Sequence, residues 1–91
     1  MKIHLRYCSA WNYEPKAVSL TAKILMQYKQ QISSLELQPD KGGCFELTAG
    51  EELIYSKLET KEFPDEEQMI AEIGNRLQWK IPIGIAVVWN S

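Results

Sequence analysis

The order of strand-like and helix-like runs restricts the fold of this chain more tightly than its composition does. Residues 3–7 alternate apolar and polar side chains, the period of a strand with one buried face. Pro15 then suits a first helical turn, and we predict a helix over roughly residues 13–32. The apolar positions at helical spacing in this run are Val18, Ala22, Leu25, Met26 and Ile32.

Three short strands are predicted to follow this helix. Residues 35–38 alternate as a strand and lead into a turn at 39–43 that is rich in Pro, Asp and Gly. Residues 45–47 and 53–55 alternate on either side of the Gly-containing turn at 49–52, which is typical of a hairpin. These two strands are therefore expected to be antiparallel.

The last helix has the clearest start signal in the chain. Asp65 is a preferred capping residue, Glu66 and Glu67 give an acidic first turn, and Gln68 stands three residues after the cap. The capping role also explains this acidic cluster without any catalytic pair of carboxylates. The apolar residues that follow at helical spacing are Met69, Ile70, Ile73 and Leu77.

The resulting order is strand, helix, strand, strand, strand, helix. A helix-long crossover joins the first two strands, so they must be parallel and connected in the right-handed sense. We therefore expect one α/β (α+β) domain with a four-stranded mixed sheet, its first strand central, and helices packed on the sheet. A chain of 91 residues is large enough for one such core and too small for two.

Charge and composition exclude several classes of partner. The net charge is −2 and there is no block of Lys or Arg, which argues against a nucleic acid or a membrane surface. Charge is uneven, because residues 1–41 are net basic and residues 51–75 are net acidic. The first residues contain no long apolar run, so we expect no signal peptide and a cytoplasmic location.

Residues 79–91 contain an apolar, β-branched run from Ile81 to Trp89. This run is shorter than the roughly 20 residues that a membrane helix needs, so no membrane span is expected. Two interpretations remain open: the run packs on the domain or extends its sheet, or it is an exposed strand that binds a protein partner.

Two cysteines are too few for a disulfide scaffold, and their spacing to His4 is not that of a metal site. Cys8 lies between the first strand and the first helix, where backbone N–H groups and the helix dipole stabilise a thiolate. We expect it in an exposed loop that small thiols reach. The alternative is a buried, inert cysteine.

His4 lies too far along the extended strand to act as a direct base and is expected at the surface or rim. The Gly42-Gly43 pair is a turn, since no Lys and helix follow it as in a phosphate-binding loop.

Two blocks of sequence resemble a known family. The first block is Tyr7-Cys8-Ser9-Ala10-Trp11-Asn12-Tyr13-Glu14-Pro15-Lys16. The second is Gly43-Cys44-Phe45-Glu46-Leu47, followed by Gly50, Ile54 and Ser56. Together they are similar to the redox loop and the later hairpin of the selenoprotein W-related (Rdx) family. The resemblance implies a thioredoxin-like domain over residues 1–78, with 79–91 as an apolar extension. It also implies that Cys8 is a catalytic nucleophile in a redox loop formed with Tyr7, Ser9, Ala10, Asn12, Tyr13 and Pro15.

Trp11 departs from this family, because it stands where the family has its second cysteine or selenocysteine. The Trp codon is one base from the Cys codons and from UGA, so natural loss, deliberate substitution and unusual decoding all remain open. The indole either shields the loop or offers a docking face.

Without a thiol at position 11, a mixed disulfide on Cys8 needs another resolving group. One possibility is that glutathione resolves the mixed disulfide, and another is that no turnover occurs. Cys44 is a third, because the resemblance places it beside the active loop; its alternative role is packing under the hairpin. We therefore expect a thiol-based redox protein, a thiol-disulfide oxidoreductase or glutathione-dependent antioxidant, with glutathione or a protein thiol as partner and no bound cofactor. The alternative is a non-catalytic module that binds protein through the active-loop face or the C-terminal run.

Overall fold

The computed structural model describes residues 1–78, and the element order predicted for them is confirmed. Two short helices, η1 and α2, are added to that order. The predictions for residues 79–91 lie outside the described residues. In chain order the elements are β1 (Lys2–Cys8), α1 (Glu14–Tyr28), the 3-10 helix η1 (Lys29–Gln31), β2 (Ser34–Asp40), β3 (Phe45–Ala49), β4 (Glu52–Ser56), α2 (Lys57–Thr60) and α3 (Glu66–Gln78).

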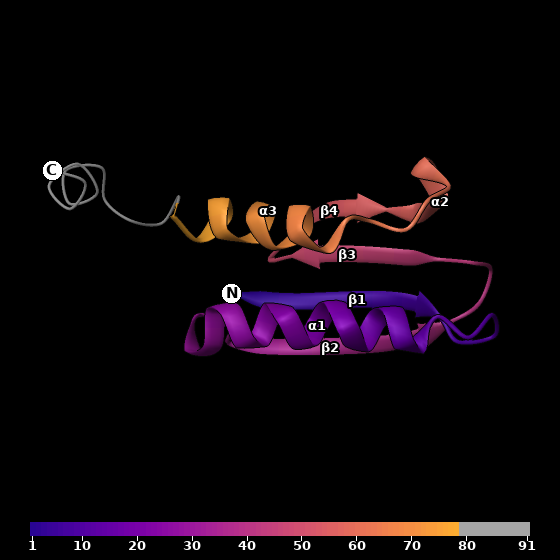
Figure 1. Cartoon of the computed structure of the whole chain (residues 1–91), viewed down its shortest axis with the longest axis horizontal. Coiled ribbons are helices and arrows are strands. Elements are labelled where there is room, and N and C mark those ends of the chain that lie inside the picture. Colours follow the sequence, from indigo (N-terminus) through magenta and orange to yellow (C-terminus); the bar gives the residue numbers. More distant parts are fainter. Residues whose placement is uncertain (79–91) are drawn as a thin grey trace, which may run out of the picture.

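The four strands form one mixed sheet in the order β2-β1-β3-β4 (Figure 1). β1 pairs in parallel with β2 and antiparallel with β3, so that Leu5 lies between Leu37 on one side and Leu47 on the other. β3 and β4 form the antiparallel hairpin. The prediction of a central first strand with a parallel neighbour is therefore confirmed.

Helices α1 and α3 lie side by side on one face of the sheet, where α1 packs on β1 and α3 on β4. The polar contacts between the helices include a hydrogen bond at 2.6 Å from the Tyr28 hydroxyl to the Ile70 carbonyl and an ion pair of Lys23 with Glu66. The core lies between this helical layer and the sheet. It is built mainly from Ile3, Leu5, Tyr7, Ala17, Leu20, Ile24, Phe45, Leu47, Ala49, Met69 and Ile73.

The other face of the sheet is polar and more open to solvent. His4, Arg6 and Gln38 lie there, and the His4 ring bonds the Gln38 side chain at 2.8 Å. His4 is thus a partly exposed sheet residue, as expected. None of the helices in the described part of the chain is long and apolar enough to cross a membrane.

Helix α1 is shorter than predicted and buries a different face. Its buried residues are Ala17, Leu20, Thr21 and Ile24, whereas Val18, Leu25 and Met26 are exposed. Burial of Thr21 is possible because its hydroxyl donates to the Ala17 carbonyl at 2.8 Å. The α-helix ends at Tyr28 because Lys29 has φ 46°, a left-handed conformation that does not continue an α-helix.

The hairpin contains a β-bulge that the alternating pattern did not predict. Leu47 pairs with Tyr55, but Thr48 pairs with Leu53, so Ile54 is an extra residue in β4. Leu53 therefore turns away from the core and is 53% exposed. The start of α3 agrees with the prediction, since the Glu67 N–H donates to the Asp65 carboxylate at 3.1 Å.

Candidate functional site

The two cysteines face each other across the end of the β1–β3 ladder. Cys8 is the last residue of β1, and Cys44 directly precedes β3. The Cys8 N–H donates to the Cys44 carbonyl at 2.9 Å, which continues the register one step beyond the pair of Tyr7 and Phe45. Residues directly opposite in an antiparallel pair project to the same face of the sheet. The structure thus brings together the two thiols singled out from the sequence.

Both cysteines are free and buried, with exposed fractions of 0% for Cys8 and 1% for Cys44. The expectation that Cys8 lies in an exposed loop is therefore wrong. Its position at the end of the central strand is the reason. Cys44 lies opposite Cys8 on the β3 side. On the β2 side, the Ser9 N–H donates to the Asp40 carbonyl at 2.9 Å and extends the contact with β2.

Charged groups on the polar face of the sheet act on Cys44. Burial raises the pKa of the Cys44 thiol, while the positive charge of Arg6 opposes that rise, and Asp40 adds to it. Arg6 bonds the Asp40 carboxylate at 3.0 Å, which holds the pKa of Asp40 below its usual value. Cys44 is consequently a thiol that is mostly protonated at neutral pH and lies near a guanidinium.

The loop between Cys8 and α1 is held by backbone hydrogen bonds. The Asn12 N–H donates to the Ser9 carbonyl, and the Tyr13 N–H donates to the Cys8 carbonyl, both at 3.1 Å. Asn12 has φ 61°, a left-handed conformation that Asn tolerates better than most residues. Pro15 follows in the first turn of α1, as predicted. These bonds hold the start of the helix against the end of β1.

The proposed redox-loop side chains point in different directions. Tyr7 is buried in the core beneath the helices, opposite Phe45. The Ser9 hydroxyl donates to the Asp40 carbonyl at 3.3 Å. The loop side chains exposed to solvent are Ala10, Trp11, Asn12 and Pro15.

Trp11 is 61% exposed, yet part of its ring lies on the turn before Cys44. A β-carbon added to Gly43 would lie 2.5 Å from the Trp11 Cζ3 atom, so the indole occupies the space that any larger residue would need. The Tyr13 ring meets the indole edge-on at 6.1 Å between centroids. Trp11 therefore covers the Gly43 backbone with one part of its ring and presents the remainder to solvent.

The family model described as the Rdx family matches residues 2–75. This chain belongs to the Rdx family. Among solved structures, a selenoprotein W-related protein from Vibrio cholerae is similar, with a TM-score of 0.79 and 22% identity over 84% of this chain and 95% of that chain. A protein from Bordetella parapertussis is also similar, with a TM-score of 0.78 and 16% identity over 82% of this chain and 95% of that chain. No curated protein matches the chain. At these identities the two structures establish the fold alone, which is the thioredoxin-like α+β fold expected from the sequence.

The second Rdx-like block has a structural role in this chain. Glu46 and Ser56 are both buried, and the Ser56 hydroxyl donates to the Glu46 carboxylate. The same carboxylate accepts from the Lys57 N–H at 2.9 Å and from the Leu58 N–H at 3.4 Å. Glu46 therefore satisfies the first N–H groups of α2 and joins β3 to the end of β4.

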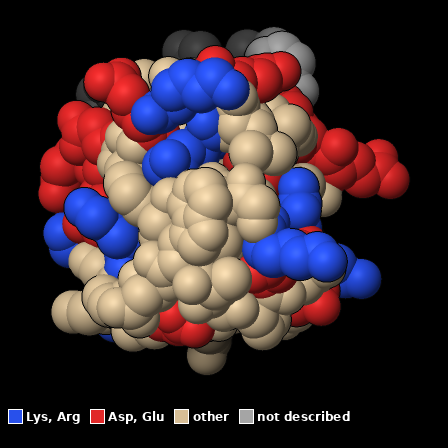
Figure 2. Space-filling view, turned by 90° about the vertical axis from the view of Figure 1, so that its right-hand side faces the viewer, with Lys and Arg blue, Asp and Glu red and all other residues tan. Residues whose placement is uncertain are grey.

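An aromatic groove that the sequence reasoning missed lies beside the loop of this Rdx-family chain. Phe63 stands edge-on between Tyr13 and Phe45, with ring centroids 4.7 and 5.3 Å away. The ammonium groups of Lys16 and Lys57 lie 4.9 and 5.0 Å from the Phe63 centroid. The groove, about 370 Å³, runs between the first turns of α1 and residues 63–66. Figure 2 looks onto this end of the molecule and shows an uncharged surface bordered by charged side chains.

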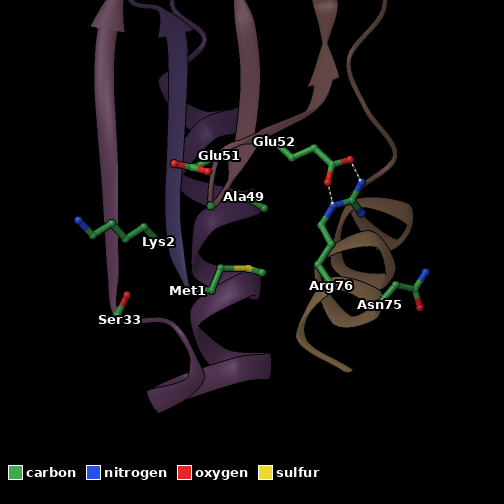
Figure 3. A pocket seen from close by; sticks show the side chains of 9 residues that line it. Met1, Lys2, Ser33, Ala49, Glu51, Glu52, Asn75 and Arg76 are labelled. Atoms are coloured by element: carbon green, nitrogen blue, oxygen red, sulfur yellow. Dashed lines mark hydrogen bonds and ion pairs between the residues drawn. The ribbon is translucent and has the colours of Figure 1, made fainter. Parts of the chain in front are cut away.

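The larger depression, about 1060 Å³, lies at the opposite end of the sheet, beside Met1 and Gly50 (Figure 3). Arg76 lines it but is already paired, with Glu52 at 2.6 Å and Glu72 at 2.7 Å. No cysteine lines this depression. Residues 1–78 contain no group of three or more His, Cys, Asp or Glu side chains placed to hold a metal ion. The thiol chemistry of the described chain is therefore confined to the Cys8 end.

Proposed function

We propose that this Rdx-family protein is a thiol-based redox protein in which Cys8 is the nucleophile and glutathione or a protein thiol is the partner. The observation that carries the proposal is the position of Cys8. It ends the central strand, and its carbonyl accepts the Tyr13 N–H that holds the start of α1 in place. A cysteine between a strand and a helix in a thioredoxin-like fold is suited to thiol–disulfide exchange.

In the proposed reaction the Cys8 thiolate attacks one sulfur of oxidised glutathione. A bond forms between that sulfur and Cys8, and the other glutathione leaves as a thiolate. Because Cys8 is fully buried, the attack requires local opening of the surrounding segments. Slow exchange that depends on this opening is therefore expected.

The test is treatment of the folded protein with oxidised glutathione, followed by mass spectrometry of its peptides. A Cys44→Ser background leaves Cys8 as the only reactive thiol, and a further Cys8→Ser change serves as the control. We expect one glutathione on Cys8 and none on the control. A folded Cys8 that stays unmodified, while the urea-unfolded chain reacts, would contradict the proposal.

A non-catalytic binding module is the second candidate, and two observations favour it. Trp11 replaces the second redox residue and is 61% exposed, and Cys8 is buried. A module of this kind predicts that Cys8 is inert in the folded state. The same glutathione experiment therefore separates the two functions.

A further inference from the structure

We infer that Cys8 and Cys44 form an internal dithiol–disulfide couple across β1 and β3, in which Cys44 resolves the mixed disulfide on Cys8. The inference rests on the proposed function, because Cys8 must react first. The position that usually supplies the resolving group is occupied by Trp11, so in this chain the second sulfur comes from a neighbouring strand.

The strand register carries this inference. The Gly50 N–H donates to the Lys2 carbonyl at 2.8 Å at one end of the β1–β3 ladder, and the Cys8 N–H donates to the Cys44 carbonyl at 2.9 Å at the other. Both pairs therefore stand at hydrogen-bonded positions of the ladder, where the Cα atoms of a complete pair typically lie about 5.5 Å apart. A disulfide needs Cα atoms about 4.4–6.8 Å apart, a range that includes this typical spacing.

The regular β1–β3 pairing ends at Cys8 and Cys44. The Cys8 carbonyl accepts the Tyr13 N–H, so it is engaged with the loop before α1. Cys44 lies outside β3 and follows Gly42 and Gly43, which both have positive φ. Any adjustment needed to bring the β-carbons to disulfide distance therefore falls on residues 42–44, which precede β3.

Burial and the charged groups of the polar face act together on the Cys44 thiol. Arg6 precedes Cys8 by two residues, so both project to the polar face of the sheet, where the titratable neighbours of Cys44 are Arg6, Asp40, Glu46 and Cys8. Burial and the two carboxylates disfavour the Cys44 thiolate, and Arg6 opposes them. The Cys44 thiol therefore favours its protonated form, and Arg6 is the cation near the negative charge that develops when this thiol loses its proton.

The proposed sequence balances with oxidised glutathione as the oxidant. Cys8 first takes one glutathione and releases the other as a thiolate. The Cys44 thiolate then attacks the Cys8 sulfur, the Cys8–Cys44 bond forms, and the second glutathione leaves as a thiolate. Two protein thiols are oxidised, one glutathione disulfide is reduced, and the thiol protons pass to solvent.

The test compares the unsubstituted chain with Cys44→Ser after identical treatment with oxidised glutathione under native conditions, with free thiols alkylated before mass spectrometry. We expect the unsubstituted chain to lose its glutathione adduct and yield a cross-linked peptide pair containing Cys8 and Cys44. Cys44→Ser should keep glutathione on Cys8. Cys44→Ala provides a second background if the serine variant fails to fold.

Different results would overturn the Cys8–Cys44 couple and the redox function of Cys8. A stable adduct on Cys8 in both the unsubstituted chain and Cys44→Ser would overturn the internal couple and leave the redox function standing. Absence of any adduct on folded Cys44→Ser and Cys44→Ala, with full modification after unfolding, would overturn both.

Discussion

The indole ring of Trp11 lies against the backbone of Gly43, in the space that a β-carbon on residue 43 would occupy. This contact joins the loop after β1 to the turn before Cys44. Glycine is therefore favoured at position 43 for two reasons. Its φ of 76° suits glycine, and a β-carbon would overlap the Trp11 ring. The turn and the loop therefore depend on each other.

Gly43→Ala is expected to displace the Trp11 ring, because the new methyl group overlaps it. Gly42→Ala is a matched control: its φ of 84° imposes similar backbone strain, but nothing lies within 4 Å of the added carbon. The Trp11 indole N–H resonance, assigned with Trp11→Phe, should shift in the first variant and stay in place in the second. Equal shifts in both would mean that strain alone accounts for the effect.

Trp11→Cys is expected to restore a two-thiol loop. In a Cys44→Ser background, oxidised glutathione should leave this variant with a disulfide between Cys8 and the new thiol at position 11, whereas the parent keeps its adduct on Cys8. The bonds from Asn12 to Ser9 and from Tyr13 to Cys8 form the tight turn that brings positions 8 and 11 together. Peptide mass spectrometry distinguishes the products, and a persistent glutathione adduct on the variant would show that the loop lacks this geometry.

The raised pKa of Cys44 predicts a loss of stability at alkaline pH. Burial favours the neutral thiol in the folded state, so the unfolded chain releases this proton first as the pH rises through the ordinary thiol value of 9.0. The free energy of unfolding should therefore fall from there up to the raised pKa. Urea unfolding across this range should show a shallower fall for Cys44→Ser. Tyr28, whose pKa burial also raises, contributes equally to both proteins.

Glu46→Ala is expected to lower the free energy of unfolding by about 1–3 kcal/mol, because it leaves the Ser56 hydroxyl and the Lys57 N–H without their acceptor. Ser56→Ala should cost less, about 1 kcal/mol, since the carboxylate keeps its backbone donors. Urea denaturation gives both values. Glu46→Gln retains an acceptor oxygen and should be milder than Glu46→Ala; an equal loss would point to the charge as the essential property.

Leu5→Ala should lower the free energy of unfolding by about 2–5 kcal/mol, since Leu5 is fully buried at the centre of the sheet. Leu53→Ala removes the same atoms from a side chain that the bulge leaves 53% exposed, and it should cost less than about 1 kcal/mol. Thermal or urea unfolding of the two variants compares them directly. Similar losses would contradict the bulged register.

Local signals were enough to predict the type and order of the main elements. The alternation of apolar and polar residues predicted β1. Pro15 and Asp65 predicted the starts of α1 and α3. A helix-long crossover required the first two strands to be parallel. Each of these signals acts over a few residues or follows from chain connectivity. They are therefore readable before any tertiary contact is known.

The buried face of α1 could not be read in the same way. Val18, Leu25 and Met26 form an apolar stripe that the structure leaves exposed. The buried face instead includes Thr21, whose hydroxyl donates to the Ala17 carbonyl within the helix. Which stripe packs inward is decided by the sheet and by α3, because only packing distinguishes two faces of similar hydrophobicity.

For the candidate site, the sequence by itself singled out Cys8, Cys44 and Trp11 and determined that no second thiol stands at position 11. Only the tertiary structure decided that Cys8 is buried, that Cys44 lies opposite it, and that Trp11 rests on Gly43. These relationships join segments far apart in the chain. They are set by the β1–β3 register and by side-chain packing, and no local pattern of residues encodes a register between distant strands.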